Sequence, residues 1–212
     1  RNTCNALEFE IDYERKIFDL YYDLKNSNYE LSRSIAFIVN YPVKREVIAS
    51  SFRDRIIHHL IFNYINPVFE ASFINDSYSC RKRKGTSYGI KRVQHFIHSC
   101  SDNYTKDCYI LKLDLSGYFM SINRNVLYKI IEDKLMKKNI EYNFDVFLVL
   151  DLIKKTIFNN CIGNCLIKGD LKDWSSLPIN KSLFCAKKDC GLPIGNLTSQ
   201  LFSNIYLSNF DN

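Results

Sequence analysis

Apolar residues recur at helical spacing in six stretches of this 212-residue chain, and that recurrence constrains the fold more than any other feature. The stretches cover about residues 11–24, 53–67, 87–99, 123–135, 143–158 and 198–210. Proline disfavours helical geometry in the residue before it, so we expect the second helix to end at Pro67. In the third helix we expect Ile90, Val93, Phe96 and Ile97 to face inward.

Alternation of apolar and polar residues predicts three short strands. Two of them lie within residues 34–50, on either side of a proline turn, and should form a hairpin. The third, CYILKLDL at residues 108–115, is the strongest strand signal and places Asp114 on the face opposite its leucines. Residues 159–191 lose periodicity and predict a long irregular insertion. The sequence therefore indicates an α+β fold, rich in helix, with a small antiparallel sheet.

Composition excludes several classes of protein. A hydrophobic fraction of 46% with 14% aromatic residues suffices for a core and argues against disorder. No apolar run reaches the roughly 18 residues that a membrane helix requires, so we expect no membrane association. The eight cysteines come without a secretory signal, which favours a reducing, cytoplasmic location.

Asp114 is the first candidate for chemistry, because it ends the predicted strand and is followed by a Ser-Gly turn. A carboxylate at a strand end can bind a divalent cation at the floor of a cleft. A solvated or turn-capping aspartate is the alternative. One carboxylate cannot hold two metal ions, which need several oxygen ligands.

A basic stretch is the second candidate. Residues 77–101 contain no acid and carry the cluster Arg81, Lys82, Arg83 and Lys84 between two tyrosines, and the net charge is +6. Such a loop suits phosphate contact, with bases or sugars against the rings. A solvated surface or a nuclear-localisation-like run would have the same composition.

Two weaker signals lie further along the chain. In LPIGNLTSQ, residues 192–200, Gly195 permits close approach of the backbone and the following helix offers unpaired amides to an anion. A plain helix-start turn is the alternative. Cys161, Cys165, Cys185 and Cys190 are loosely spaced for zinc, and free thiols are the default expectation. The His58-His59 pair is expected to be helical without a catalytic role.

Taken in order, four segments resemble the reverse transcriptase family. They are KREVIASSFRDRIIHHLIFNYINPVFEASF (44–73), SYSCRKRKGT (77–86), ILKLDLSGYFMSINRNVL (110–127) and GLPIGNLTSQLFSNIYLSNFD (191–211). Most members have Gln before the loop glycine and Ser-Pro after it, where this chain has Ile194 and Ser199-Gln200. That pattern, with DWSSLPINKSLF at 173–184, is similar to reverse transcriptases of diversity-generating retroelements from bacteria and their phages.

The resemblance implies a nucleotide-binding set. It consists of Lys44, Arg45, Gly117, Tyr118, Phe119, Ile194 and Gly195. Arg45 and Lys44 would reach over the triphosphate, since a guanidinium suits phosphate oxygens. The ring of Phe119 would lie beneath the sugar and exclude a 2′-hydroxyl. Ile194 replaces a hydrogen-bonding reader with an apolar contact, so we expect error-prone synthesis.

The same resemblance implies a metal site and partners. Asp114 would bind both Mg²⁺ ions, and the Leu115 carbonyl would assist at one of them. Arg81, Lys82, Arg83, Lys84 and Gln200 would face the template, with Arg81 contacting template or fingers backbone. The partners would be template RNA, a DNA or RNA primer, a deoxynucleoside triphosphate (dNTP) and a basic accessory protein. Two metals would assist attack of the primer 3′-hydroxyl on the α-phosphate.

The resemblance also implies an organisation by the hand-like parts of a polymerase. Fingers with an N-terminal helix would cover 1–104, and a palm strand 105–124. Fingers helices and the insertion would cover 125–190, and a palm loop and helix 191–212. The family's Asp-Asp turn and thumb do not follow within this sequence, so we expect the chain alone to be inactive.

Two other readings of these residues stay open. The chain could belong to a group II intron-like or defence-associated reverse transcriptase. Alternatively, it could be a catalytically idle RNA-binding module that uses residues 77–101, with salt-sensitive binding that survives Asp114→Asn.

Overall fold

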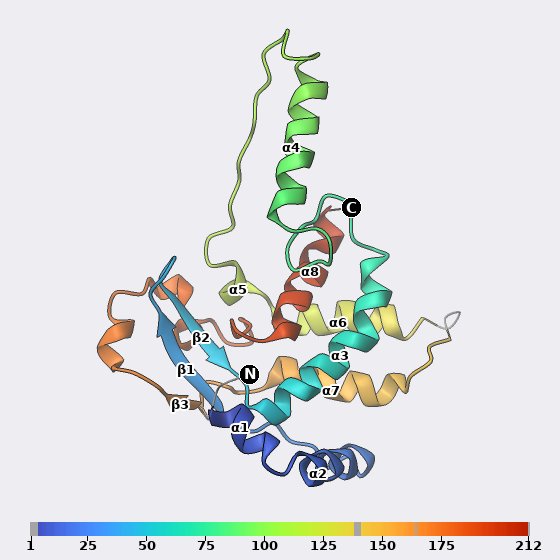
Figure 1. Cartoon of the computed structure of the whole chain (residues 1–212), viewed down its shortest axis with the longest axis vertical. Helices are drawn as coiled ribbons and strands as arrows, with labels where there is room; N and C mark the ends of the chain where they lie inside the picture. The colour runs from blue at the N-terminus through green and yellow to red at the C-terminus, as the bar shows by residue number, and fades with distance from the viewer. Residues whose placement is uncertain (1–3, 138–140, 164, 212) are drawn as a thin grey trace.

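The computed structural model describes residues 4–137, 141–163 and 165–211, so the outermost residues of the expected 1–104 and 191–212 segments lie outside it. The helices are α1 (Cys4–Glu10), α2 (Tyr13–Lys25), α3 (Phe52–Glu70), α4 (Thr86–Cys100), α5 (Tyr118–Ser121), α6 (Arg124–Leu135), α7 (Val146–Phe158) and α8 (Leu197–Asp211). The strands are β1 (Ser34–Val39), β2 (Arg45–Ala49) and β3 (Cys165–Ile167). Short 3₁₀ turns η1 (Leu171–Trp174), η2 (Ile179–Lys181) and η3 (Leu183–Cys185) follow β3. This confirms an α+β fold that is rich in helix (Figure 1).

The main core lies between four helices, α3, α6, α7 and α8, which contact one another in pairs. Each contributes a fully buried branched aliphatic side chain, such as Ile61, Ile131, Ile153 and Ile205. Side-chain caps also fix where helices begin. At the start of α6, the side chain of Asn123 accepts hydrogen bonds from the backbone N–H groups of residues 125 and 126. The predicted helical stripes at these four segments are therefore real packing faces.

The sheet is mixed, with strand order β2-β1-β3. The predicted hairpin is confirmed, with β1 and β2 antiparallel and Phe37 opposite Val47. The expectation of an antiparallel sheet is wrong for the third strand, because β3 pairs parallel to β1. β3 comes from the insertion, which sequence analysis treated as irregular. A three-residue strand carries too few alternations to be seen in a sequence.

The segment 108–115 is not a strand, which corrects the strongest strand prediction. It is extended but unpaired within the part of the chain that the structure describes. Its apolar side chains face solvent, with Tyr109 88% and Leu113 81% exposed. Alternation reports which side chains share a face, but a strand also needs a neighbour for its N–H and C=O groups.

Two helix expectations are also wrong in part. α3 runs through Pro67 to Glu70, because Phe69 in the added turn is buried in the main core. Burial of a phenylalanine contributes about 1.5–3 kcal/mol, comparable to the cost of an internal proline. α4 forms where expected but buries none of its residues, and Figure 1 shows it projecting from the body. Ile90 is 54% exposed instead of facing inward.

No described helix combines the length and the apolar character that a bilayer span needs.

Candidate functional site

A pocket of about 380 Å³ collects residues that are far apart in the sequence. Its lining consists of Val43, Lys44, Arg45, Gly117, Tyr118, Phe119, Met120, Asn180, Lys181 and Ile194. Six of the seven residues expected to bind a nucleotide are therefore lining residues. They come from the hairpin, from α5 and the turn before it, and from the loop before α8.

Gly117 shapes the floor of this pocket through its backbone. Its φ of +64° is left-handed, and a Cβ at this position would lie 2.5 Å from the carbonyl oxygen of Asn180. A side chain there would be strained and would also collide with the insertion. The Asn180 side-chain amide donates to Ser116 Oγ at 2.7 Å. The glycine thus lets two distant segments meet beside the nucleotide-binding candidates.

The loop before α8 joins the hairpin by hydrogen bonds. Ile48 N donates to the Ile194 carbonyl at 2.8 Å, and Ser50 N donates to Asn196 Oδ1 at 3.1 Å. Gly195 has a φ of +128°, and a Cβ there would lie 2.8 Å from Val47 Cγ1. Gly195 therefore lets the loop pack closely against Val47 of β2, while Ile194 lines the pocket.

The pocket is positively charged, because its lining includes three cationic side chains and no carboxylate. Arg45 and Lys181 are exposed, whereas Lys44 is half-buried and donates to Ser176 Oγ at 2.6 Å. Such a lining suits an anionic group beside the ring of Phe119. Asn180 and Lys181 were not predicted from the sequence, since neither belongs to a recognisable local pattern.

Asp114 and Leu115 lie just before the Gly117 turn but do not line the pocket. Asp114 is exposed, and among the described residues no group of three or more His, Cys, Asp or Glu side chains is arranged to hold a metal. One carboxylate and one carbonyl fall short of the oxygen ligands that two Mg²⁺ ions require. These residues by themselves do not fit a complete two-metal site.

A buried carboxylate fastens the insertion to the hairpin. Glu46 on β2 is 1% exposed and accepts hydrogen bonds from Trp174 Nε1 (2.8 Å), Ser182 Oγ (2.8 Å) and Leu183 N (2.7 Å). Charge-assisted bonds of this kind offset the cost of burying an ion. Glu46 was not among the sequence candidates, and it holds in place the segment that carries Asn180 and Lys181.

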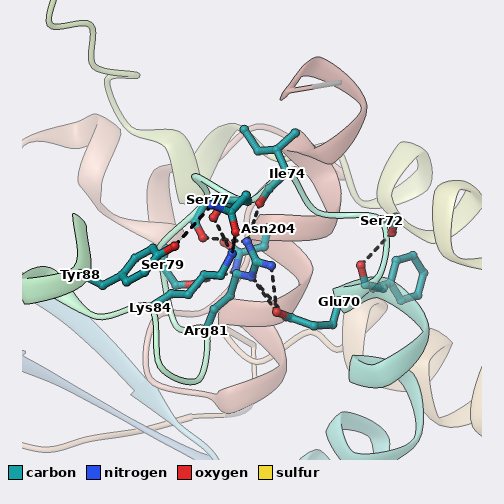
Figure 2. Close-up of polar contacts among 11 residues, drawn as sticks. Glu70, Ser72, Ile74, Ser77, Ser79, Arg81, Lys84, Tyr88 and Asn204 are labelled. Carbon is teal, nitrogen blue, oxygen red and sulfur yellow. Dashed lines mark hydrogen bonds and ion pairs between the residues drawn. The ribbon is translucent and has the colours of Figure 1, made fainter. Parts of the chain in front are cut away.

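Arg81 is one of the residues expected to face the template, but its side chain bonds to the end of α3 and to its own loop (Figure 2). Its side chain is 5% exposed and pairs with Glu70 at 2.8 Å. It also donates to the carbonyls of Ile74 and Ser77 at 2.7 and 2.8 Å. Arg81 therefore contacts the backbone of its own loop, and its donors are occupied.

The neighbouring basic residues divide into two kinds. Lys84 donates to Asn75, whereas Lys82 and Arg83 are exposed in the turn that a bond from Lys84 N to the Arg81 carbonyl closes. The loop is tied to α8 by a bond from Asn204 Nδ2 to the Ser79 carbonyl at 2.7 Å. Gln200 is exposed on the first turns of α8. The side chains left for an outside partner are thus Lys82, Arg83 and Gln200.

A buried histidine links the elements behind the pocket. Thr198 Oγ1 lies 2.8 Å from His58 Nδ1, and Ser50 Oγ lies 3.0 Å from His58 Nε2. Burial lowers the pKa of His58 to about 4, and repulsion by His59 and Arg55 acts in the same direction. His58 is therefore neutral and joins α3, α8 and the end of β2.

All eight cysteines are free thiols.

Comparison with known proteins gives one distant likeness. No family model matches the chain. The chain is 25% identical over 161 residues to Protein YkfC of Escherichia coli (strain K12), an alignment that covers 76% of this chain and 35% of that protein. The chain thus spans about a third of the length of that relative. At this identity the likeness assigns no family.

Proposed function

We propose that this chain is the nucleotide-binding part of an RNA-directed DNA polymerase, most similar to those of diversity-generating retroelements. In this proposal residues 1–104 and 125–190 are fingers, and 105–124 and 191–212 are palm. The observation that supports it is the pocket: residues 44–45, 117–119 and 194, selected by motif, line one cavity. Three segments that lie far apart in the sequence and were selected by motif would rarely line one pocket by chance.

The lining has the chemistry that a dNTP needs. The guanidinium of Arg45 and the ammonium of Lys44 would bind phosphate oxygens. The backbone amides of Gly117 and Tyr118 would bind phosphate oxygens, and Phe119 would lie against the sugar. Ile194 would contact the base by shape alone, which favours errors in copying.

The overall reaction would be attack of a primer 3′-hydroxyl on the α-phosphate, with pyrophosphate leaving. Mg²⁺, when bound, would neutralise charge on the phosphates. Asp114 would supply one carboxylate for Mg²⁺, and template RNA, a primer and an accessory protein are proposed partners of the whole enzyme.

Binding of fluorescent dATP to the chain in the presence of Mg²⁺ tests the proposal. We expect saturable binding that Arg45→Ala weakens by about tenfold, because one charge-assisted phosphate contact is lost. The control is Arg33→Ala, which removes an exposed arginine just before β1, at the hairpin end away from Arg45. Absence of binding, or equal losses in both variants, would contradict the proposal.

A further inference from the structure

One wall of the pocket comes from the insertion, through Asn180 and Lys181 of η2. This segment lies more than sixty residues from Gly117 in the chain, yet the Asn180 side chain bonds to Ser116 Oγ. The wall was absent from the expected nucleotide-binding set. It brings a third cation to a pocket that already contains Lys44 and Arg45.

The wall is fixed to the hairpin at several points. Ser182, directly after η2, donates to the buried carboxylate of Glu46 at 2.8 Å, and Leu183 N donates to the same group at 2.7 Å. Lys44 reaches Ser176 of the same segment at 2.6 Å. These contacts hold the backbone of η2 at a set position beside the pocket, so Lys181 is presented by an ordered element.

The ammonium of Lys181 has no acidic partner. Across the described ranges, no hydrogen bond or ion pair engages its side chain, and no carboxylate lines the pocket. Most exposed lysines are simply solvated. This one differs in its position, because it shares a concave surface with two other cations and an aromatic ring.

We propose that Lys181 binds the polyphosphate of the nucleotide together with Lys44 and Arg45. The inference rests on the proposed function and deepens it: the triphosphate is held from both the hairpin and the insertion. Because Lys181 would act on phosphate charge, its effect should be the same with or without a base on the ligand. It should be absent for a ligand without phosphate.

Calorimetric titration of the chain with dATP, inorganic tripolyphosphate and deoxyadenosine tests this. Lys181→Met should weaken dATP and tripolyphosphate binding by about tenfold and leave any deoxyadenosine binding unchanged. The slope of log affinity against log salt should fall by about one. Lys181→Arg should retain affinity. The matched control is Lys172→Met, an exposed lysine of η1 that does not line the pocket.

The outcomes separate the two proposals. If Lys181→Met binds dATP like the wild type while Arg45→Ala is weakened, Lys181 is only solvated and the inference fails alone. If tripolyphosphate binding depends on Lys181 but dATP does not bind, Lys181 binds phosphate as proposed and the proposed nucleotide-binding function is wrong. If neither ligand binds the wild type, both proposals fall.

Discussion

Glu46 shows how one side chain can position a whole segment. An isolated carboxylate in the interior costs several kcal/mol, in rough terms, unless donors surround it. Its donors here include Trp174 and Leu183, which lie 128 and 137 residues away in the sequence. No local pattern announces such a pairing. That is why Glu46, Asn180 and Lys181 were not predicted, whereas short motifs selected Gly117 and Ile194, which line the pocket.

At Phe119, sugar selection can be tested directly. The ring lines the pocket and packs against the main core and against a second buried cluster that contains Ile48 and Leu183, so it is held in place. In competition binding we expect the wild type to prefer dATP over ATP, and Phe119→Ala to reduce that preference by about tenfold because the barrier to a 2′-hydroxyl is removed. Phe119→Tyr keeps the ring and should keep the preference. An unchanged ratio in the alanine variant would remove the sugar-gate role.

At the scale of elements, the segment 108–115 and helix α4 show that an apolar pattern in the sequence does not predict whether the apolar face is buried. Both have well-formed apolar faces, and both present them to solvent: Leu111 is 81% and Phe96 46% exposed. Periodicity identifies a face but contains no information about what covers it. The helices of the core, by contrast, were predicted correctly apart from the end of α3, because their apolar stripes meet one another within the chain.

The basic loop between α3 and α4 carries a prediction about RNA. Arg81 fixes the shape of this loop by its bonds to Glu70, Ile74 and Ser77, so the exposed side chains of Lys82 and Arg83 are free to contact phosphates. The double variant Lys82→Ala/Arg83→Ala should weaken RNA binding equally for all sequences and lower the salt slope by about one to two. Filter binding at several salt concentrations measures both quantities.

A charge-matched pair controls that experiment. Lys187→Ala/Lys188→Ala removes the same charge from exposed positions in the insertion and should leave RNA binding nearly unchanged. Equal losses in the two double variants would show that net charge, and not this loop, attracts RNA.

For the molecule as a whole, His58 makes stability depend on pH. The native imidazole has a pKa of about 4, below the ordinary value of 6.5, so below pH 6.5 the unfolded chain binds the extra proton more readily. This contribution is complete above pH 6.5 and is lost as pH falls toward 4, by on the order of 3 kcal/mol. Denaturant unfolding at pH 7, 6, 5 and 4 should show the loss.

Two histidine variants isolate this effect. His58→Gln removes the titration and should flatten the decline between pH 6.5 and 4, although the protein is less stable at pH 7. His95→Gln, at an exposed position of α4, should decline like the wild type. A His58→Gln profile parallel to that of the wild type would assign the acid sensitivity to other groups.

The bonds around Glu46 also have a thermodynamic consequence for binding. Because the hairpin, the insertion and the loop before α8 are already joined to one another, the walls of the pocket are in place before a ligand arrives. A ligand then orders a few long side chains and little backbone. Its association carries a small entropic penalty from the protein, and affinity is governed by charge and by the water that the ligand displaces.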